Sequence, residues 1–440
     1  MFTGQLSAQT FSVLLSFTSE NKGATRPSAG LISIGTNLYG VTEGGGGGAV
    51  GALVRVSTNG MHFTNLYSFA SASGIYPRGR LVLSGNTLYG TMSQGGPYGG
   101  TVFAINSDGT DFRTLHSFSE TGFVETSGLI ISGNILYGTR YGGGSFGAGA
   151  VFAINTDGTG FTNLYNFTAG FTNTDGAHPV AELVLSGSTL YGTTSEGGNV
   201  GGGTVFRLDT NGLSFTNLHN FTDGLNGVTP RAGLVLTGNT LYGVTTGGWV
   251  GSDGVIFKLN TDGTSFTNLY HFSGGNDGNF PYSTLVVSGK TIYGTTSGGG
   301  QSNSGTVFKV NIDGGSFATL HDFTAKSAPN LTGTNSDGAL LYSSLLLIDN
   351  TLYGVAYGGG PSGNGTMFSI FIQPELSITP FGTDLVLAWP SSYSDFTLQS
   401  TTNIVSPVWT TNSQIPVIVN GQNTVTNPIS GNQQFFRLGQ

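Results

Sequence analysis

Short stretches in which apolar and polar residues alternate recur along most of the chain, always in the same order. Each copy holds an apolar run such as "LVLSG", then "TLYGTT", then "GTVFKVN", then "FTNLYSF". Alternation with a period of two is typical of half-buried β-strands. A Tyr-Gly pair marks each copy, and the tyrosines are Tyr39, Tyr89, Tyr137, Tyr191, Tyr242, Tyr293 and Tyr353. Four strands in roughly 50 residues match one blade of a β-propeller, so the pattern predicts an all-β fold with seven such blades.

Turn sequences separate these strands. "SGNT" links the first two strands of a copy, and "NSDGT" (106–110) or "NTDGT" (260–264) links the last two. An Asp-Gly pair at a two-residue turn favours a tight hairpin in which both central residues have positive φ. The turns therefore predict antiparallel pairing of neighbouring strands within each copy.

The two ends of the array predict how it closes. The seventh copy supplies "SSLLLID", "NTLYGVA" and "GTMFSIF" without a fourth strand, whereas the chain begins with an extra strand sequence, "FSVLLSF" at 11–17. Pairing that strand with the last copy would complete the seventh blade and remove an open sheet edge. We therefore expect residues 9–372 to form one seven-bladed β-propeller closed by the N-terminal strand.

The segment before the ring has features of a secretion signal, but not a complete one. "MFTGQLSAQTFSVLLSF" lacks a basic start and a long apolar stretch, yet its "LSAQ" is typical of the end of a leader. We expect residues 1–8 to be a leader remnant.

From 373 to 440 the repeat pattern gives way to five or six alternating segments, among them "TDLVLAWP" and "NTVTNP". Trp389 and Trp409 are the predicted core anchors, because large aromatic residues dominate the packing of small β domains. The segment resembles a small fibronectin-III-like β-sandwich, although it is short for one. We expect it to be a spacer or attachment module, and a ligand-binding module is the alternative.

The repeat itself carries a family resemblance. The sixth copy runs from Asp277 to Phe323 and contains "DGNFPYSTL", "TIYGTTSGGG", "GTVFKVNIDGG" and "LHDF". This composite, present seven times over about four-fifths of the chain, resembles the GloVer tandem repeat of bacterial surface and secreted proteins. The resemblance implies an exported propeller and supplies no catalytic residues.

Composition excludes several classes of partner. Only 8% of the 440 residues are charged, 75 are Gly and the net charge is −8 without a basic block, which argues against nucleic acid and anionic membranes as partners. No apolar run approaches the roughly 20 residues that span a bilayer, so no membrane insertion is expected. The chain has no Cys, which excludes disulfides, thiolate metal sites and a cysteine nucleophile.

The connections between copies vary in length and sequence, and variable loops on a rigid scaffold are where binding usually resides. Five of them end in a proline before the next first strand, at Pro27, Pro77, Pro179, Pro230 and Pro281. The residue after the proline differs between copies. This makes the following side chains candidate ligand contacts: Arg78, Val180, Arg231 and Tyr282.

The glycine-rich segments between the second and third strands add aromatic residues on the same predicted face. The candidates are Tyr98, Tyr141, Phe146, Trp249 and Tyr357. Aromatic faces among amides and hydroxyls suit sugar rings, whereas aromatics beside glycines also pack within a protein. The sequence leaves both interpretations open.

Histidines and turn aspartates are expected to have structural roles. His116, His219 and His321 fall at the repeat position that holds Tyr in other copies, which predicts a packed ring with a polar tip rather than a base or ligand. No His pair has zinc-like spacing, and each Asn-x-Asp-Gly turn offers at most two oxygens to a cation. The sequence therefore predicts no metal and no cofactor.

Carboxylates that would reach the variable face are Glu43, Glu125, Glu182, Glu196, Asp253 and Asp277. They share no repeat position, as would also be true of an asymmetric active site. No nucleophile-elbow sequence occurs. We predict a non-enzymatic extracellular or cell-surface protein that binds a glycan or a surface protein through the variable loops. The alternatives are a structural protein that self-associates and a polysaccharide-acting enzyme.

Overall fold

The computed structural model of the chain describes residues 9–18, 24–45, 50–94, 99–119, 127–170, 173–222, 226–247, 253–374, 376–391, 393, 396–428 and 433–439. These residues form strands and turns, and their single helical segment is a 3₁₀ turn, η1 (Ser71–Ser73). In the described part of the chain no helix has the length and apolar character needed to cross a membrane. The chain divides into unit 1 (Met1–Thr10, Asp349–Thr351 and Ile370–Gln440) and unit 2 (Phe11–Ile348 and Leu352–Ser369). The predicted 1–8 leader remnant lies outside the described residues.

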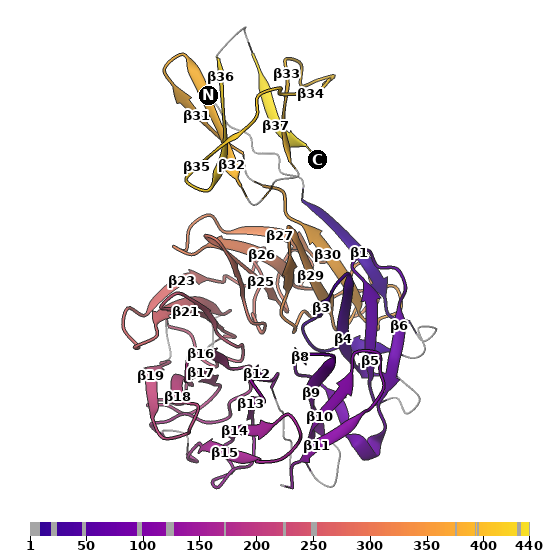
Figure 1. Ribbon diagram of the computed structural model, residues 1–440, viewed down its shortest axis with the longest axis vertical. Helices are drawn as coiled ribbons and strands as arrows, with labels where there is room; N and C mark the ends of the chain where they lie inside the picture. Colours follow the sequence, from indigo (N-terminus) through magenta and orange to yellow (C-terminus); the bar gives the residue numbers. More distant parts are fainter. Residues whose placement is uncertain are drawn as a thin grey trace. The chain divides into compact units, whose positions relative to one another are not determined.

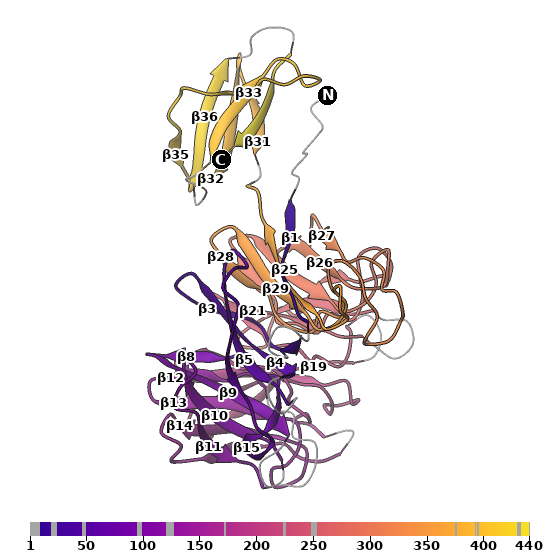
Figure 2. The same cartoon turned by 90° about the vertical axis from the view of Figure 1, so that its right-hand side faces the viewer.

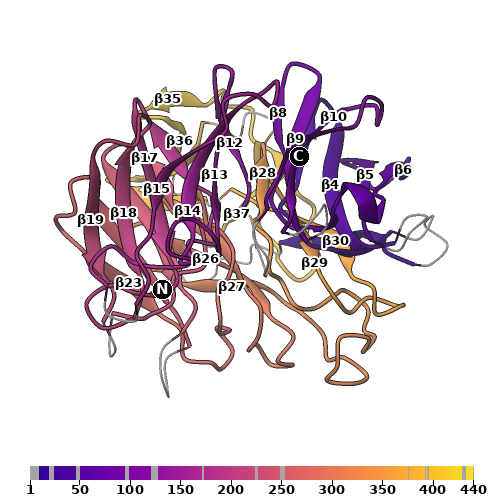
Figure 3. The same cartoon turned by 90° about the horizontal axis from the view of Figure 1, so that it is seen from below.

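The repeats form seven antiparallel sheets of four or five strands among the described residues (Figures 1 and 3). The first repeat holds β2 (Thr25–Pro27), β3 (Ile32–Ile34), β4 (Asn37–Gly44), β5 (Ala52–Ser57) and β6 (Thr64–Ser68). The second holds β7 (Ile75–Pro77), β8 (Val82–Ser84), β9 (Thr87–Gln94), β10 (Thr101–Asn106) and β11 (Arg113–Ser117). The third holds β12 (Ile130–Ser132), β13 (Ile135–Arg140), β14 (Ala150–Asn155) and β15 (Thr162–Asn166).

The later repeats follow the same plan. The fourth holds β16 (Val184–Ser186), β17 (Thr189–Thr194), β18 (Thr204–Asp209) and β19 (Phe215–Asn220). The fifth holds β20 (Val235–Thr237), β21 (Thr240–Thr245), β22 (Val255–Asn260) and β23 (Thr267–His271). The sixth holds β24 (Val286–Ser288), β25 (Thr291–Thr296), β26 (Thr306–Asn311) and β27 (Ala318–Asp322). The seventh holds β28 (Leu346–Ile348), β29 (Thr351–Ala356) and β30 (Thr366–Phe371).

The N-terminal strand completes the seventh sheet. β1 (Thr10–Ser16) lies beside β30 in the order β1-β30-β29-β28 (Figure 1). Phe17, which follows β1, is buried in one cluster with Leu38 of the first repeat and Tyr353 of the seventh. The ring of Phe11 stacks on that of His321, with centroids 3.5 Å apart. β1 thus packs against residues of the first, sixth and seventh repeats.

A stacked ring pair recurs between successive repeats. The Tyr or His near the end of each fourth strand lies parallel to a Phe of the following repeat, as in Tyr67 on Phe112 and His116 on Phe161. The same stack joins Tyr165 to Phe215, His219 to Phe266 and Tyr270 to Phe317. This position requires a flat ring on an aromatic neighbour, which is the packing role predicted for its histidines.

Three of these Tyr and His rings hydrogen-bond through their polar tips to aspartates of the following connection. Tyr165 and Tyr270 donate to Asp175 and Asp277, each at 3.0 Å. Burial, followed by the Asp277 carboxylate, raises the pKa of Tyr270 to about 12. His321 lies 2.9 Å from Asp337. Each aspartate stands four residues before Pro179, Pro281 or Leu341 in the connection to the next repeat, so the loop sequence supplies the partner of the ring.

The connection between the fourth and fifth repeats lacks this aspartate, and this difference predicts that the stability of the fold depends on pH. Asn226 stands where three other connections hold Asp175, Asp277 and Asp337, and the buried Nε2 of His219 has no hydrogen-bond partner among the described residues. Burial lowers the pKa of His219 to about 4. The unfolded chain, with a histidine pKa near 6.5, therefore binds the proton more tightly, so His219 lowers stability as the pH falls from about 6.5 to 4.

Replacing Asn226 by Asp should supply the missing carboxylate and raise the pKa of His219. We expect a stability gain of about 1 kcal/mol at pH 5, seen as a higher melting temperature by about 2 °C, because the pair is only partly buried. At pH 8 the gain should vanish. Asn226→Gln is the uncharged control, and an unchanged His219 titration by NMR in Asn226→Asp would contradict the assignment.

The Asp-Gly turns do not have the expected two-residue geometry. In the turn at 106–110 only Gly109 has positive φ, at 88°, and Asp108 does not. Asp108 instead accepts hydrogen bonds from the hydroxyl and backbone N–H of Thr110 at 2.6 and 2.9 Å, and these lower its pKa. Asn106 N–H bonds to the Thr110 carbonyl, which makes the loop longer than two residues. The predicted turn with two positive φ values was wrong, because the Thr side chain stabilises a wider turn.

Unit 1 contains two sheets that share a core, and its strands can be followed in Figure 2. One sheet has the order β31 (Ser377–Phe381), β32 (Asp384–Pro390), β36 (Gln422–Pro428), β35 (Val417–Val419), and the other β34 (Thr410–Thr411), β33 (Thr397–Thr401), β37 (Phe435–Gly439). Trp389 is fully buried in the core with Leu387 and Val425. Trp409 was wrongly predicted as a core anchor: it is partly exposed, and the guanidinium of Arg437 covers its ring at 4.4 Å.

Candidate functional site

All seven repeats contribute to one cavity of about 270 Å³ in unit 2. The contributing residues lie just before the strands β3, β8, β12, β16, β20, β24 and β28, and we call these stretches the inner segments. They are 28–30, 78–80, 127–128, 180–182, 231–233, 282–284 and 342–344. The cavity is called the axial cavity below. The inner segments come from the variable connections, so the cavity lies where the sequence predicts the ligand contacts.

Close approach of the inner segments explains their small central residues. Each central residue is Ala, Gly or Ser. A Cβ on Gly79 would lie 2.7 Å from the carbonyl oxygen of Ser127 and 2.8 Å from Cα of Gly128 in the next repeat. Real Cβ atoms do not approach backbone so closely, so the spacing of the strands fixes the residue. Only the residues on either side of the central residue can therefore vary between repeats.

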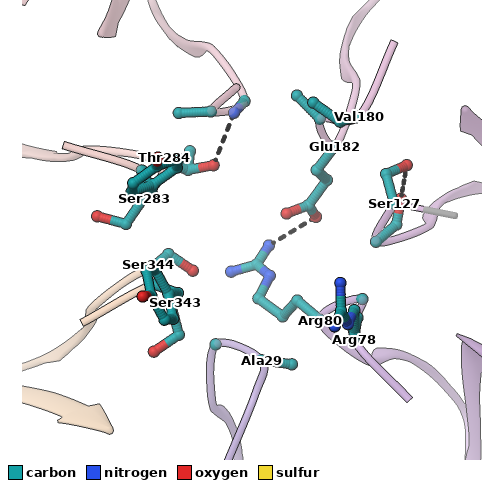
Figure 4. Close-up of a pocket in the computed structure, with 18 of the residues that line it drawn as sticks. Ala29, Arg78, Arg80, Ser127, Val180, Glu182, Ser283, Thr284, Ser343 and Ser344 are labelled. Carbon is teal, nitrogen blue, oxygen red and sulfur yellow. Dashed lines mark hydrogen bonds and ion pairs between the residues drawn. The ribbon is translucent and has the colours of Figure 1, made fainter. Parts of the chain in front are cut away.

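An ion pair spans the axial cavity. Arg80 of the second repeat reaches toward Glu182 of the fourth, and Nη2 and Oε1 are 3.2 Å apart (Figure 4). Burial raises the pKa of Glu182, and the guanidinium of Arg80 opposes that rise. Nε of Arg80 is also buried and has no hydrogen-bond partner among the described residues. The cavity therefore contains a donor that protein atoms leave unsatisfied, which is a place for a polar ligand atom or water.

A band of aromatic and charged side chains links four repeats beside the cavity. Tyr282 meets Tyr342 edge to face at 5.6 Å, and Tyr342 meets Tyr357 in the same way at 5.8 Å. Tyr357 donates to Glu43 at 2.7 Å, and Glu43 also accepts from Nε of Arg78 at 2.6 Å. Burial, then the bond to Glu43, raises the pKa of Tyr357 to about 12. We call these five residues the rim band; they present neutral phenols next to a paired carboxylate.

Arg231 gives the site a cationic side chain that has no ion-pair partner among the described residues. It lines the axial cavity from the fifth repeat, is exposed, and forms no ion pair with any described residue. The other two arginines of the cavity, Arg78 and Arg80, are paired with Glu43 and Glu182. The lining is thus left with one cationic group that has no internal counter-charge, in a chain whose net charge is −8. Such a group attracts a carboxylate or another anion.

The predicted contact residues are distributed over two places. Arg78, Val180, Arg231 and Tyr282 line the axial cavity, and Tyr357 joins its rim band. Phe146 lines a second pocket, where Tyr141 stacks on His178. Tyr98 and Trp249 lie outside the described residues. Among the described residues, no three His, Asp or Glu side chains are grouped closely enough to hold a metal ion.

Sequence reasoning missed Arg80 and Tyr342 as parts of the site. Tyr342 occupies the same repeat position as Arg78, Arg231 and Tyr282, but Leu341 replaces the proline that marks the others. Arg80 lies two residues after the variable position, on the same face of an extended segment. Alignment of the seven copies on the following leucine would have revealed both.

Comparison with solved structures supports the fold class. The chain has a TM-score of 0.53 with an oligogalacturonate lyase in complex with manganese, at 10% identity over 85% of this chain and 99% of that one. It has a TM-score of 0.51 with the GH74 enzyme of Niastella koreensis, at 15% identity over 98% and 72%. The score is also 0.51 with an extracellular domain from B. thetaiotaomicron, at 11% identity over 99% and 56%. At these identities the likeness concerns the fold alone.

None of the curated proteins matches the sequence. The Gloeobacter/Verrucomicrobia repeat family matches it in three overlapping stretches, 1–170, 121–259 and 226–379, which together contain every Tyr-Gly marker. The same residues form the repeated antiparallel sheets and the inner segments of the axial cavity. The chain is therefore a member of the Gloeobacter/Verrucomicrobia repeat family.

Proposed function

We propose that the protein is an exported, non-enzymatic propeller that binds an acidic glycan, a sugar chain bearing a carboxylate, at its axial cavity. The observation that carries this proposal is Arg231, a cationic side chain in the cavity without a described counter-charge. The rim band adds phenol rings, and Ser283, Ser344 and Thr284 add hydroxyls around the same space (Figure 4). Apolar ring faces with a few convergent polar groups are typical of saccharide-sized binding sites.

The proposal includes a closed ring of seven blades. Its support is the lining of one cavity by all seven repeats and the position of β1 beside β30. The core cluster that joins Tyr353 to Leu38 supports a direct contact between the last repeat and the first. In such a ring the inner strands surround the axis, which agrees with their small central residues.

The state of the carboxylates favours binding over hydrolysis. A glycoside hydrolase needs two carboxyl groups that face the same bond, one as acid and one as base or nucleophile. Glu43 is held between Arg78 and Tyr357, and Glu182 is held by Arg80. Asp277 is occupied by Tyr270 and Ser273. Each of these three carboxylates has a structural partner, which supports a non-enzymatic function.

A second candidate function is self-association through unit 1. The edge strand β35 consists of Val417, Ile418 and Val419, which are 65%, 66% and 49% exposed. An apolar edge strand with unpaired backbone groups favours pairing with another chain. A surface or matrix protein that assembles in this way would also be exported, as the resemblance to the GloVer repeat implies.

Replacing Arg231 by Gln tests the binding proposal. We expect the full-length protein to bind uronate-containing oligosaccharides saturably in calorimetric titrations, and Arg231→Gln to weaken binding at least tenfold, about 1.4 kcal/mol, because a charge-assisted bond is lost. Arg207→Gln is the matched control, since Arg207 is an exposed arginine outside the cavity.

Three results would reject the proposal in different ways. Equal affinity of Arg231→Gln and Arg207→Gln would remove the assigned contact. Absence of binding together with concentration-dependent assembly would favour self-association. Turnover of a polysaccharide that is lost in Glu43→Gln would make the protein an enzyme.

A further inference from the structure

A second pocket, of about 250 Å³, lies between the third and fourth repeats. Its walls combine Phe146 from a glycine-rich segment, His178 from the following connection and Glu196 from the next glycine-rich segment. None of these three residues belongs to the lining of the axial cavity. The pocket is therefore a separate feature of unit 2.

Backbone hydrogen bonds fix the three loops that form this pocket. His178 N–H donates to the Ala148 carbonyl at 2.8 Å. Ala177 and Glu196 exchange two backbone hydrogen bonds, at 2.8 and 3.1 Å. The ring of Tyr141 stacks on that of His178 with centroids 4.2 Å apart. The pocket is thus preformed, which reduces the entropy lost when a ligand binds.

The polar groups of the pocket are hydrogen-bond acceptors. Nδ1 of His178 lies 2.9 Å from the carbonyl oxygen of Tyr141, and because a carbonyl only accepts, Nδ1 carries the proton. In the neutral ring Nε2 then offers a lone pair. Nε2 and Oε2 of Glu196 are 3.8 Å apart, too far for a direct hydrogen bond. A ligand that presents two neighbouring donors can satisfy both atoms.

An apolar surface lies in the same pocket. The side chain of Phe146 is 57% exposed, although phenylalanine is among the residues most often buried. The face of its ring carries partial negative charge and favours contact with the weakly positive C–H groups of a ligand. A sugar ring has such a C–H face, and vicinal hydroxyl donors project from its edge. An ammonium group has three N–H donors and could also reach both acceptors, but it presents no flat C–H face to the Phe146 ring.

We propose that this pocket binds a neutral pyranose. Two vicinal hydroxyls donate to Nε2 of His178 and to the carboxylate of Glu196, and the C–H face of the sugar covers Phe146. This pocket thus favours a neutral ligand, whereas Arg231 in the axial cavity favours an anion. The inference does not depend on the axial ligand.

Titration of the full-length protein with neutral methyl glycosides tests the site. We expect at least one of the methyl glucosides, galactosides or mannosides to give saturation-transfer NMR signals with a dissociation constant of about 1 mM. Phe146→Ala and Glu196→Gln should each weaken binding at least tenfold. Leu213→Ala is the matched control, because Leu213 is an apolar turn residue that is 83% exposed and lies away from the pocket. Arg231→Gln should leave this binding unchanged.

Several outcomes would overturn the site. These are no saturable binding of any neutral glycoside up to about 20 mM, unchanged affinity in Phe146→Ala, and binding of the cationic methyl glucosaminide alone. Loss of binding in Arg231→Gln would assign the sugar to the axial cavity instead. Melting temperatures of all variants show whether a loss of binding reflects a loss of folding, and Glu196→Gln keeps the shape of the side chain for this purpose.

Discussion

Removing residues 1–17 should prevent unit 2 from folding to a stable monomer. The deletion takes away β1 and leaves β30 as an open sheet edge. It also removes Phe17, which is 1% exposed, and the Phe11 ring that stacks on His321. Each large apolar side chain contributes about 1.5–3 kcal/mol when buried, and Leu14 and Leu15 pack against the same cluster. The summed loss is comparable to the whole stability of a typical domain, about 5–15 kcal/mol.

The measurement is size-exclusion chromatography with thermal unfolding, and a deletion of residues 1–8 is the control. The shorter deletion should leave the melting temperature unchanged. A synthetic peptide of residues 9–18 should restore part of the stability of the longer deletion by adding a strand to β30. A monomeric 1–17 deletion with unaltered melting temperature would contradict the proposed closure.

Replacing Gly294 by Ala should cost about 3 kcal/mol. A Cβ at this position would lie 2.5 Å from Cζ of Phe308 and 2.9 Å from Cδ2 of Leu285. Both side chains are buried in the core, so neither has space to move. Overpacking of this kind costs about 1–3 kcal/mol, and we expect the upper end because the contact is with a fully buried ring. Gly243 and Gly192 meet the equivalent Phe and Leu side chains of their own repeats.

Gly289→Asn is the contrasting variant for this prediction. Gly289 has φ of 58° and open space around its Cα, so only backbone conformation limits the residue. Asn tolerates the left-handed region, and Asp349 already occupies the equivalent position of the seventh repeat with φ of 50°. We expect a change below about 0.5 kcal/mol in chemical denaturation. Equal destabilisation by the two substitutions would show that side-chain space does not decide the Tyr-Gly position.

The sequence predicted the repeated unit well, because the information for it is local. Alternating residues and turn signals define a strand such as Thr291–Thr296 without any knowledge of its neighbours. The equivalence of Tyr and His in the fourth strand also predicted a packed ring, as Tyr270 and His321 show. The repetition also aided the prediction, because a residue that recurs in all seven copies is required by the structure and is not there by chance.

The errors and omissions occur where the environment is not local. Trp409 looked like a core residue because of its size, but Arg437 covers it outside the core. The turn at Asp108 was misread because the hydroxyl of Thr110 changes the turn type. The ion pair of Arg80 with Glu182 joins residues 102 positions apart that share no pattern. The site consists of residues that differ between copies, so the similarity between copies that defines the repeat does not reveal it.

The position of β1 also has a consequence for the order of synthesis. β1 leaves the ribosome before every other described strand, and its partner β30 is made roughly 350 residues later. At about 5–20 residues per second the nascent chain carries the apolar sequence "FSVLLSF" without its native neighbour for tens of seconds. A chaperone that holds this segment in an extended state would therefore raise the yield of folded protein.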